Sequence, residues 1–164
     1  RSDYDLTSHA KKSNEKFEVM DGEEKTLPHV FELSMGIDRS LYTILEHSLK
    51  DDKANERTVL SVKPYLAPIH VGVLSLVKKD GLAEITDEIY LNIKTKFDAF
   101  LDHSGAIGRR YRRLDELGAP FAITVDHQTK EDQTITIRRR DSMEQSRIKI
   151  SELETILATE IAFP

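Results

Sequence analysis

The sequence predicts an α/β fold, in which three helices cover a mixed sheet of about five strands. Residues 69–77 form an apolar run of strand length that is rich in β-branched residues, which is typical of a strand covered on both faces. Apolar residues from Leu82 to Phe97 recur at spacings of 3 and 4, which is typical of an amphipathic helix. Strands and helices that alternate in this way predict right-handed crossovers and a mixed sheet.

The next elements are predicted from the residues at their ends. Asp80 is an N-cap candidate for the helix over residues 82–97. A short strand is expected at residues 99–102. Ser104 can cap a second helix, which Gly118 and Pro120 would end.

The C-terminal part adds strands and a closing helix. Three segments have the composition or alternation of strands: residues 121–125, 134–138 and 147–150. Ser151 and Glu154 have the spacing of a capping box, which predicts a helix that continues to Ile161.

Residues 1–57 have a different character. They contain one strand candidate at residues 29–33 and one helix, which would begin near Arg39 or Ser40 and continue to Leu49. Residues 51–57 are mostly charged and are interpreted as a solvated linker or surface loop. One strand and one helix leave an apolar face uncovered, so we expect residues 1–57 to be a remnant of one domain and residues 58–164 to be a second domain.

Composition excludes several classes of protein. The 164 residues carry 24 Lys and Arg against 29 Asp and Glu, a net charge of −5, which excludes a globally basic nucleic-acid binder but leaves a local basic face open. The absence of Cys excludes disulfides and thiolate zinc sites. The longest apolar run is far shorter than the roughly 20 residues of a membrane span. The chain begins at Arg1 without a leader, and we expect it to be a fragment of a longer protein.

Two arginine-rich runs are candidates for RNA contact. The first is residues 109–113, where helical spacing puts Arg109, Arg112 and Arg113 opposite the apolar arc and Arg110 on its flank. The second is residues 138–140. Guanidinium groups suit phosphates and base edges, whereas a solvated face balanced by carboxylates is the alternative interpretation. Aromatic residues are only 7% of the chain, which argues against a platform of several stacked rings.

Residues 32–39 are a second candidate site. A strand end, a small-residue turn and an Arg at the start of a helix would surround one cavity with a carboxylate, a helix N-terminus and a guanidinium. Such a cavity suits a zwitterion and a polyphosphate, but a strand-to-helix turn with a surface Arg is the alternative. The six His residues have no metal-ligand spacing, and we expect no metal site.

Five segments in chain order resemble the C-terminal part of dimeric-type glycyl-tRNA synthetases, which are class II aminoacyl-tRNA synthetases. They are residues 1–6 (RSDYDL), 28–39 (PHVFELSMGIDR), 66–69 (LAPI), 102–116 (DHSGAIGRRYRRLDE) and 139–145 (RRDSMEQ). Threonyl, prolyl and histidyl synthetases share the C-terminal fold of this family, whereas the segments at 102–116 and 139–145 are similar to the glycyl branch.

The resemblance implies roles for the front segment, which is similar to the third class II motif. Glu32, Ser34 and Gly36 would line the glycine pocket. Arg39 would be the catalytic residue that meets the ATP phosphates, and residues 36–39 (Gly36, Ile37, Asp38, Arg39) would form part of the nucleotide site. Leu33 and Met35 depart from the smaller residues typical of the family. The first two class II motifs are absent, so we expect the fragment alone to be inactive.

The resemblance also implies that residues 58–164 bind the tRNA(Gly) anticodon. Its two cytosines donate hydrogen bonds that acidic side chains accept, so Glu116 or Glu144 are candidate readers. The candidate RNA-contacting arginines are Arg109, Arg112, Arg113, Arg138, Arg139 and Arg140.

For the intact enzyme the resemblance implies ATP as substrate, Mg²⁺, glycine, tRNA(Gly), a homodimer and a cytoplasmic location, without a membrane. No cofactor is expected on the fragment, which can be a monomer because the pairing surface lies mostly in the absent part. A non-catalytic nucleic-acid-binding or protein-binding module of the same fold, such as a polymerase accessory subunit or a synthetase-like regulator, is the alternative. The intact segment at residues 32–39 favours the enzyme.

Overall fold

The computed structural model describes residues 3–163 and divides the chain into two compact units, residues 1–40 and 41–164. The boundary falls inside helix α2 (Ile37–Ser48). The second unit thus includes residues 41–57 together with the domain expected at residues 58–164. No helix among the described residues is long and apolar enough to cross a membrane.

The first unit contains a helix, α1 (Asp3–Ser13), and an antiparallel hairpin of β1 (Val19–Asp21) and β2 (Glu24–Thr26). Residues 27–36 form neither helix nor strand, so the prediction of a strand at residues 29–33 is wrong. An apolar segment becomes a strand only where a neighbouring strand takes its backbone hydrogen bonds. Without one the segment leaves Phe31 91% exposed.

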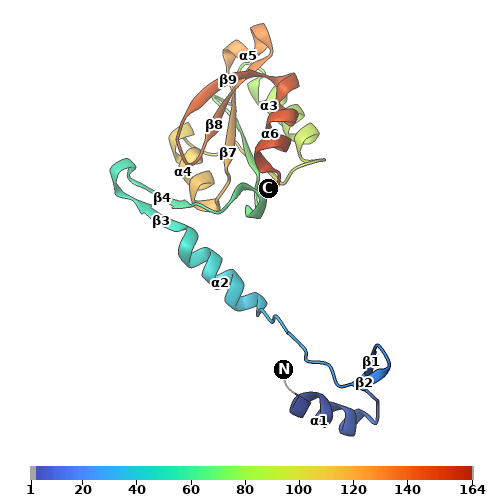
Figure 1. Cartoon of the computed structure of the whole chain (residues 1–164). Coiled ribbons are helices and arrows are strands. Elements are labelled where there is room, and N and C mark those ends of the chain that lie inside the picture. The colour runs from blue at the N-terminus through green and yellow to red at the C-terminus, as the bar shows by residue number, and fades with distance from the viewer. Residues whose placement is uncertain (1–2, 164) are drawn as a thin grey trace. The chain divides into compact units, whose positions relative to one another are not determined.

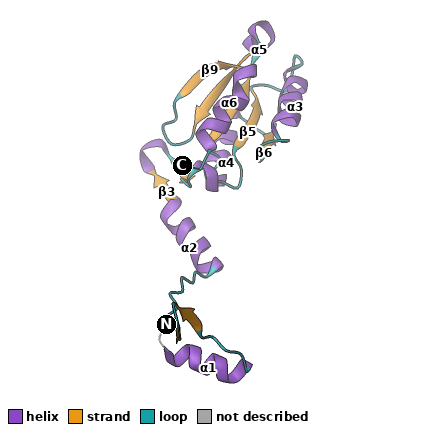
Figure 2. Cartoon of the chain, turned by 45° about the vertical axis from the view of Figure 1, so that its right-hand side comes forward, coloured by secondary structure: helices purple, strands orange, loops and turns teal. Residues whose placement is uncertain are grey.

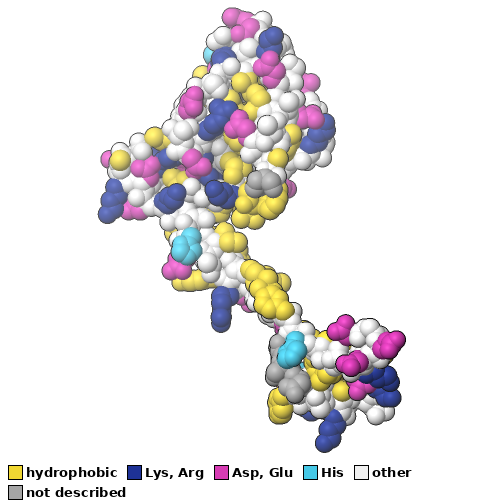
Figure 3. Space-filling view, viewed as in Figure 1, with side chains coloured by type: hydrophobic (Ala, Val, Ile, Leu, Met, Phe, Trp, Pro, Cys, Tyr) yellow, Lys and Arg dark blue, Asp and Glu magenta, His cyan; other side chains and the backbone are white. Residues whose placement is uncertain are grey.

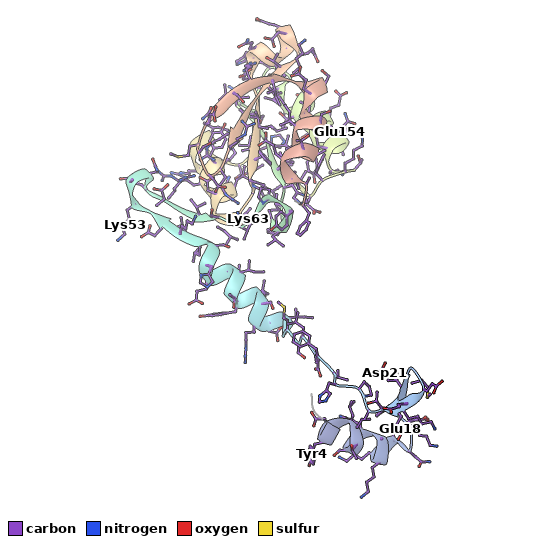
Figure 4. All side chains as sticks on the ribbon, in the orientation of Figure 1. Tyr4, Glu18, Asp21, Lys53, Lys63 and Glu154 are labelled. Atoms are coloured by element: carbon purple, nitrogen blue, oxygen red, sulfur yellow. The ribbon has the colours of Figure 1, made fainter. Side chains whose placement is uncertain are left out.

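After the remainder of α2, the second unit contains a hairpin whose residues 51–57 the sequence analysis interpreted as a solvated linker or surface loop. β3 (Leu49–Asp52) pairs antiparallel with β4 (Arg57–Leu60), and the short 3-10 turn Lys53–Asn55 joins them. Figure 4 labels Lys53 at the tip of this hairpin. The charged composition of residues 51–57 is compatible with a hairpin because the Arg57 side chain is held by Asp52 and Asp115. A second 3-10 turn, Pro64–Leu66, leads to the main sheet.

The predicted five-stranded mixed sheet is confirmed, with the strand order β6-β5-β7-β8-β9. β5 pairs parallel with β6 and β7, whereas β7–β8 and β8–β9 are antiparallel. Figure 2 shows β9 at one margin of the sheet and β6 at the other. The strands are β5 (Val71–Ser75), β6 (Ala99–Asp102), β7 (Phe121–Val125), β8 (Thr134–Arg139) and β9 (Gln145–Lys149).

Helices lie on both sides of this sheet (Figure 1). α3 (Leu82–Ile93) and α6 (Ile150–Ile161) cover one face, with the larger apolar core between them and the sheet. α4 (Ile107–Leu117) packs on the other face over a smaller cluster that includes Leu74 and Leu114. Gly72 permits this close approach, because a Cβ atom there would lie 2.2 Å from Leu114 Cδ1. The three predicted helices are thus present, and the short α5 (His127–Asp132) is an addition.

Several helix ends differ from the prediction for local reasons. α4 begins after Ala106 rather than at Ser104, because the Ser104 N–H binds Asp102 Oδ1 at 2.7 Å. α3 begins at Leu82 as predicted, but its N-cap is Gly81 rather than Asp80 and it ends at Ile93 rather than at Phe97. The N-cap of α6 is Lys149, two residues before the predicted Ser151, and Glu152 accepts a hydrogen bond from the Lys149 N–H. Gly118 ends α4 as predicted, in the left-handed conformation with a φ of 80°.

Candidate nucleic-acid interface

The first arginine-rich run is divided between the interior and the surface. Arg110 is buried, and its guanidinium donates to the carbonyls of Ser75, Leu76 and Asp102, so it caps the carboxyl ends of β5 and β6. Burial lowers the pKa of Arg110, although the Asp102 carboxylate opposes this effect. Arg113 donates to Asp102 Oδ2 and lies on the β6 side of α4. Both groups hold the end of the sheet together.

Asp102 is the carboxylate that these arginines share. Its burial favours the neutral form, but the Ser104 N–H and the Arg113 guanidinium bind the carboxylate and outweigh this effect. The pKa of Asp102 is therefore lowered from its ordinary value. This carboxylate stays ionised and anchors α4 to the end of β6.

Arg138 lies inside the unit, in what we call the Asp115 cluster: Arg57, Asp115 and Arg138. Arg138 binds Asp115 with two hydrogen bonds of 2.8 and 3.0 Å, and Arg57 donates to the same carboxylate at 3.0 Å. Arg57 also binds Asp52 at 2.8 Å. The cluster ties the β3–β4 hairpin, α4 and β8 to one another, and its two positive charges are balanced by Asp115 and Asp52. The guanidinium of Arg138 also lies over the Tyr111 ring, 5.1 Å from the centroid.

Arg140 is even more deeply buried, with 1% of its surface exposed. It donates to the carbonyls of Leu60, Val62 and Gly118 at 2.7 to 3.0 Å and to the Asp141 carboxylate. Its guanidinium therefore holds the chain after β4 against the end of α4. Arg138 and Arg140 were predicted to contact RNA, and the structure instead encloses both of them, because they satisfy buried carbonyls and carboxylates.

Arg139 faces the opposite side of the sheet from Arg138, as alternation along β8 requires. It binds Glu160 of α6 through Nε at 3.0 Å and through Nη2, and 32% of its side chain is exposed. The Glu160 hydrogen bond raises the pKa of Arg139. Arg139 is thus on the α6 side, away from α4.

Arg109 and Arg112 are the members of these runs that face solvent. Both are exposed, and within residues 3–163 neither side chain makes a hydrogen bond or ion pair. Arg112 is three positions before Asp115 on α4, so it shares the flank of the helix that faces β8. The candidate cytosine readers Glu116, on α4, and Glu144, in the β8–β9 turn, are also exposed.

An uncovered polar surface lies beside this flank of α4. Residues paired across antiparallel strands share a face, and Ala122 of the α4-side cluster pairs with Arg138. The α4 side of β8 and β9 therefore carries polar side chains beyond Arg138, which we call the open face: Thr134, Thr136, Gln145, Arg147 and Lys149. All five are exposed or half-buried.

The sequence analysis missed the open face. The alternation of β9, with Gln145, Arg147 and Lys149 on one side and Ser146 and Ile148 on the other, is the signal that could have found it. The prediction of this strand began at residue 147, so the pattern was cut short. Lys and Arg are also interspersed with Asp and Glu over the surface that Figure 3 displays, with no large patch of one sign.

Arg147 is the most strongly bound side chain of the open face. Its guanidinium binds the carboxylate of Asp126, which follows β7, through both Nη atoms. The Arg147 hydrogen bond is the largest influence on Asp126, and together with the Thr129 N–H it lowers the pKa of that carboxyl despite partial burial. Asp126 also caps α5 by accepting from the Thr129 N–H at 3.2 Å.

The front segment has its own local geometry within the first unit. The Ser34 hydroxyl donates to Glu32 Oε1 at 2.7 Å, so two of the three residues predicted to line a glycine pocket are in contact. Gly36, Ile37, Asp38 and Arg39 form the turn into α2 and its first turn, and the Gly36 carbonyl accepts from the Ser40 N–H at 2.9 Å. All residues from 31 to 39 are exposed. Residues 1 and 2 of the N-terminal segment used in the resemblance lie outside the described residues.

A serine, a histidine and an aspartate are connected at the carboxyl ends of β5 and β6. Ser75 Oγ lies 3.0 Å from His103 Nδ1, and His103 Nε2 lies 2.9 Å from Asp87 Oδ1. Ser75 is fully buried, so it cannot reach a substrate as a nucleophile, and the three residues join α3 to the sheet. Among residues 3–163 no three His, Asp or Glu side chains converge as a metal site requires.

The second unit has helices on both faces of a mixed five-stranded sheet and an uncovered polar surface beside α4. Residues 70–160 match the family described as "Anticodon binding domain". The chain belongs to this family.

Relatives and solved structures agree with that assignment. A "Glycine--tRNA ligase" of Treponema denticola is 46% identical over 98% of this chain, and one of Methanothermobacter thermautotrophicus is 51% identical over 83%. The resemblance to glycyl-tRNA synthetases is thus confirmed. The chain spans 38% and 24% of the lengths of these two relatives.

The fold is also found in solved structures. The RNA binding domain of threonyl-tRNA synthetase from Cryptosporidium parvum Iowa II matches with a TM-score of 0.57 and 20% identity, over 63% of this chain and 26% of that chain. Prolyl-tRNA synthetase from Cryptosporidium parvum, in complex with halofuginone and AMPPNP, matches with a TM-score of 0.57 and 23% identity, over 62% of this chain and 22% of that chain. These likenesses support the predicted anticodon-binding fold.

Proposed function

We propose that the unit of residues 41–164 binds the anticodon loop of tRNA(Gly) on the open face and the adjoining flank of α4. The observation that carries this proposal is the contrast on β8, where Ile135 and Ile137 are fully buried on one face while Thr134 and Thr136 on the other face lie at an uncovered polar surface. An antiparallel sheet can pack one face against the core and leave the other face in water, and the residues of the solvated face are then polar. The similarity to "Glycine--tRNA ligase" proteins supports tRNA(Gly) as the RNA.

Within this interface Arg112 would hold a phosphate, and Arg109 would hold a neighbouring one. Both are exposed and uncommitted to internal bonds, and Arg forms bidentate contacts with phosphate. Glu116, one turn beyond Arg112, and Glu144 remain candidate acceptors for cytosine amino groups. We leave Arg113, Arg138, Arg139 and Arg140 out of the interface, because carboxylates and carbonyls of this chain already engage them.

RNA binding by the chain is the direct test. The anticodon stem-loop of tRNA(Gly) and the same stem-loop with its two anticodon cytosines changed to uracil would be titrated against the 164-residue chain. We expect tighter binding of the cytosine loop, by about tenfold or more for each lost base contact. Equal affinity for both loops would contradict anticodon reading, and no measurable binding of either would contradict the proposed interface.

We also propose that the whole protein is a glycine–tRNA ligase that uses ATP. In the front segment Glu32, oriented by the 2.7 Å hydrogen bond from Ser34, would hold the glycine ammonium group beside Gly36. Arg39 would stabilise the charge that develops as the glycine carboxylate attacks the α-phosphate of ATP. Specificity for glycine would come from a pocket too shallow for any side chain. The first unit, residues 1–40, would then belong to the catalytic-domain remnant expected within residues 1–57.

The remaining features of that enzyme are part of the same proposal: a homodimer, a cytoplasmic location and Mg²⁺ with the ATP. The described residues hold no cluster of acidic or histidine side chains that fits a metal ion, so we derive no step through Mg²⁺. We expect the 164-residue chain to form no glycyl-adenylate from glycine and ATP. Pyrophosphate exchange measures this reaction directly, and exchange above background by the purified chain would overturn the expectation.

A further inference from the structure

The hydrogen bonds of Arg147 account for every donor that its guanidinium has. Nε donates to Thr134 Oγ1 at 2.7 Å, Nη1 to Asp126 Oδ2 and Thr136 Oγ1, and Nη2 to Asp126 Oδ1 and the Thr134 carbonyl. A guanidinium has five N–H donors, all in its plane. All the N–H groups along the edge of this guanidinium therefore already donate to atoms of the protein.

Saturation removes the usual ways in which Arg binds RNA. A phosphate or base edge would have to displace Asp126, whose two oxygens form a bidentate contact with the guanidinium. The positive charge is also largely cancelled by this carboxylate, so the pair attracts phosphate weakly. Yet 28% of the Arg147 side chain stays exposed on the open face.

The part of the guanidinium that remains available is its planar surface. Arginine planes stack on unpaired bases as aromatic rings do. The plane of Arg147 is held by groups from two neighbouring segments, Thr134 and Thr136 of β8 and Asp126 after β7, so stacking would cost it little conformational entropy.

This chain also lacks the ring platform that single-stranded RNA usually requires. It has no Trp and 7% aromatic residues. The ring of Tyr111, on the α4 side of the sheet, is already engaged by Arg138 and by the bond between its hydroxyl and Thr124 Oγ1 at 2.6 Å. The base of a splayed-out nucleotide therefore needs another flat surface.

We propose that Arg147, held by Asp126, Thr134 and Thr136, is a stacking platform for one unpaired base of the bound RNA. This inference rests on the proposed anticodon-loop interface. Stacking tolerates any base, so Arg147 contributes affinity without selecting the sequence, whereas base identity is read elsewhere on the surface.

Two substitutions at Arg147 distinguish the contribution of its planar surface to RNA binding from the contribution of its charge. Arg147→Lys keeps the charge and loses the plane, whereas Arg147→Tyr keeps a plane and loses the charge, in a strand where Tyr is well tolerated. We expect Arg147→Lys to weaken binding of the stem-loop about tenfold and Arg147→Tyr to stay within about threefold of the unchanged chain. Better binding by the Lys variant than by the Tyr variant would overturn stacking in favour of a charge contact.

Arg139→Lys is the matched control, because Arg139 also binds a carboxylate and is similarly exposed, but on the α6 side of the sheet. We expect its affinity to equal that of the unchanged chain. We also expect Arg147→Lys to leave the slope of log K against log salt unchanged, since no phosphate contact is lost. A slope that falls by about one would contradict the proposal.

Binding measurements with stem-loops that lack one loop base at a time identify the base that stacks on Arg147. One abasic position should weaken the unchanged chain about tenfold and the Arg147→Lys variant not at all, because base and platform act as a pair. Equal abasic effects in both proteins at every position would overturn stacking while leaving RNA binding intact. Failure of the unchanged chain to bind the stem-loop would instead overturn the proposed interface and the stacking inference with it.

Discussion

The two faces of the five-stranded sheet are built from different chemistry on the same strands. On the α3/α6 side, Ile123, Ile135 and Ile137 are fully buried in an apolar core. On the α4 side, the same strands carry Thr124, Thr136 and Arg138, and a network of ion pairs replaces much of the apolar packing. The comparison teaches that one face stabilises the fold by burial, whereas the other depends on paired charges and leaves part of its surface for a ligand.

The largest effect is expected from removing the carboxylate at the centre of the α4 side. Asp115→Ala leaves Arg138 buried without its counter-ion and removes one of the two carboxylates that bind Arg57. The free energy of unfolding should fall by about 3–5 kcal/mol. Urea denaturation followed by circular dichroism measures this loss, with Glu116→Ala, exposed on the same helix, as a control that should change it by less than about 0.5 kcal/mol. A loss as small as that of the control would show that the network does not hold this face.

A smaller effect is expected where α4 approaches the sheet. Gly72→Ala puts a Cβ atom into the side chain of Leu114 and should cost about 1–3 kcal/mol of stability. Gly108→Ala is the matched substitution on α4, where the Cβ atom meets nothing within 4 Å. It should stabilise the chain by up to about 1 kcal/mol through helix propensity. Thermal unfolding distinguishes the two, and equal effects would contradict the close approach of α4.

The next prediction tests whether the α4 side is the RNA side. Arg112→Ala should weaken binding of the tRNA(Gly) stem-loop several-fold at physiological salt and reduce the slope of log K against log salt by about one. Arg139→Ala, on the α6 side, should alter neither quantity. If Arg139→Ala weakens binding more than Arg112→Ala does, the assignment of the two faces is reversed.

The smallest effect on stability is expected from changing the ion pair between Asp126 and Arg147 on the open face. Because the pKa of Asp126 is lowered in the folded chain, its carboxylate stabilises the fold above the unfolded pKa of about 3.9, and this contribution is lost as the pH falls through the lowered value. Asp126→Asn keeps a capping side chain and should cost about 0.5 kcal/mol at pH 6, since the pair is partly exposed.

The acid dependence provides the check on this pair. The stability difference between the Asp126→Asn variant and the unchanged chain should shrink as the pH falls through the lowered pKa of Asp126, because the folded and unfolded carboxyls are then both protonated. Urea midpoints at a series of pH values measure it, with Glu131→Gln on α5 as the control. A difference that stays constant down to acid pH would exclude the carboxylate as its source.

Local pattern predicted the strands and helices of the second unit well, but it could not assign the arginines. Residues 99–102 and 121–125 are strands with the predicted bounds. By contrast, helical spacing put Arg110 on the flank of α4, and its burial became visible only with the carbonyls at the ends of β5 and β6. The runs at 109–113 and 138–140 look equally basic in sequence, and the carboxylates that neutralise Arg138 and Arg113 are 23 and 11 positions away.

The amino-acid sequence by itself determined the α/β class, the five strands, the main helices and the resemblance to glycyl-tRNA synthetases, because periodicity and local motifs are properties of neighbouring residues. Tertiary structure alone decided which guanidinium groups face solvent. It also brought Asp126, which follows β7, into contact with Arg147 of the edge strand β9. The physical reason is that the charge available to a ligand depends on what each cation has already bound, and those partners are brought together only when the sheet forms.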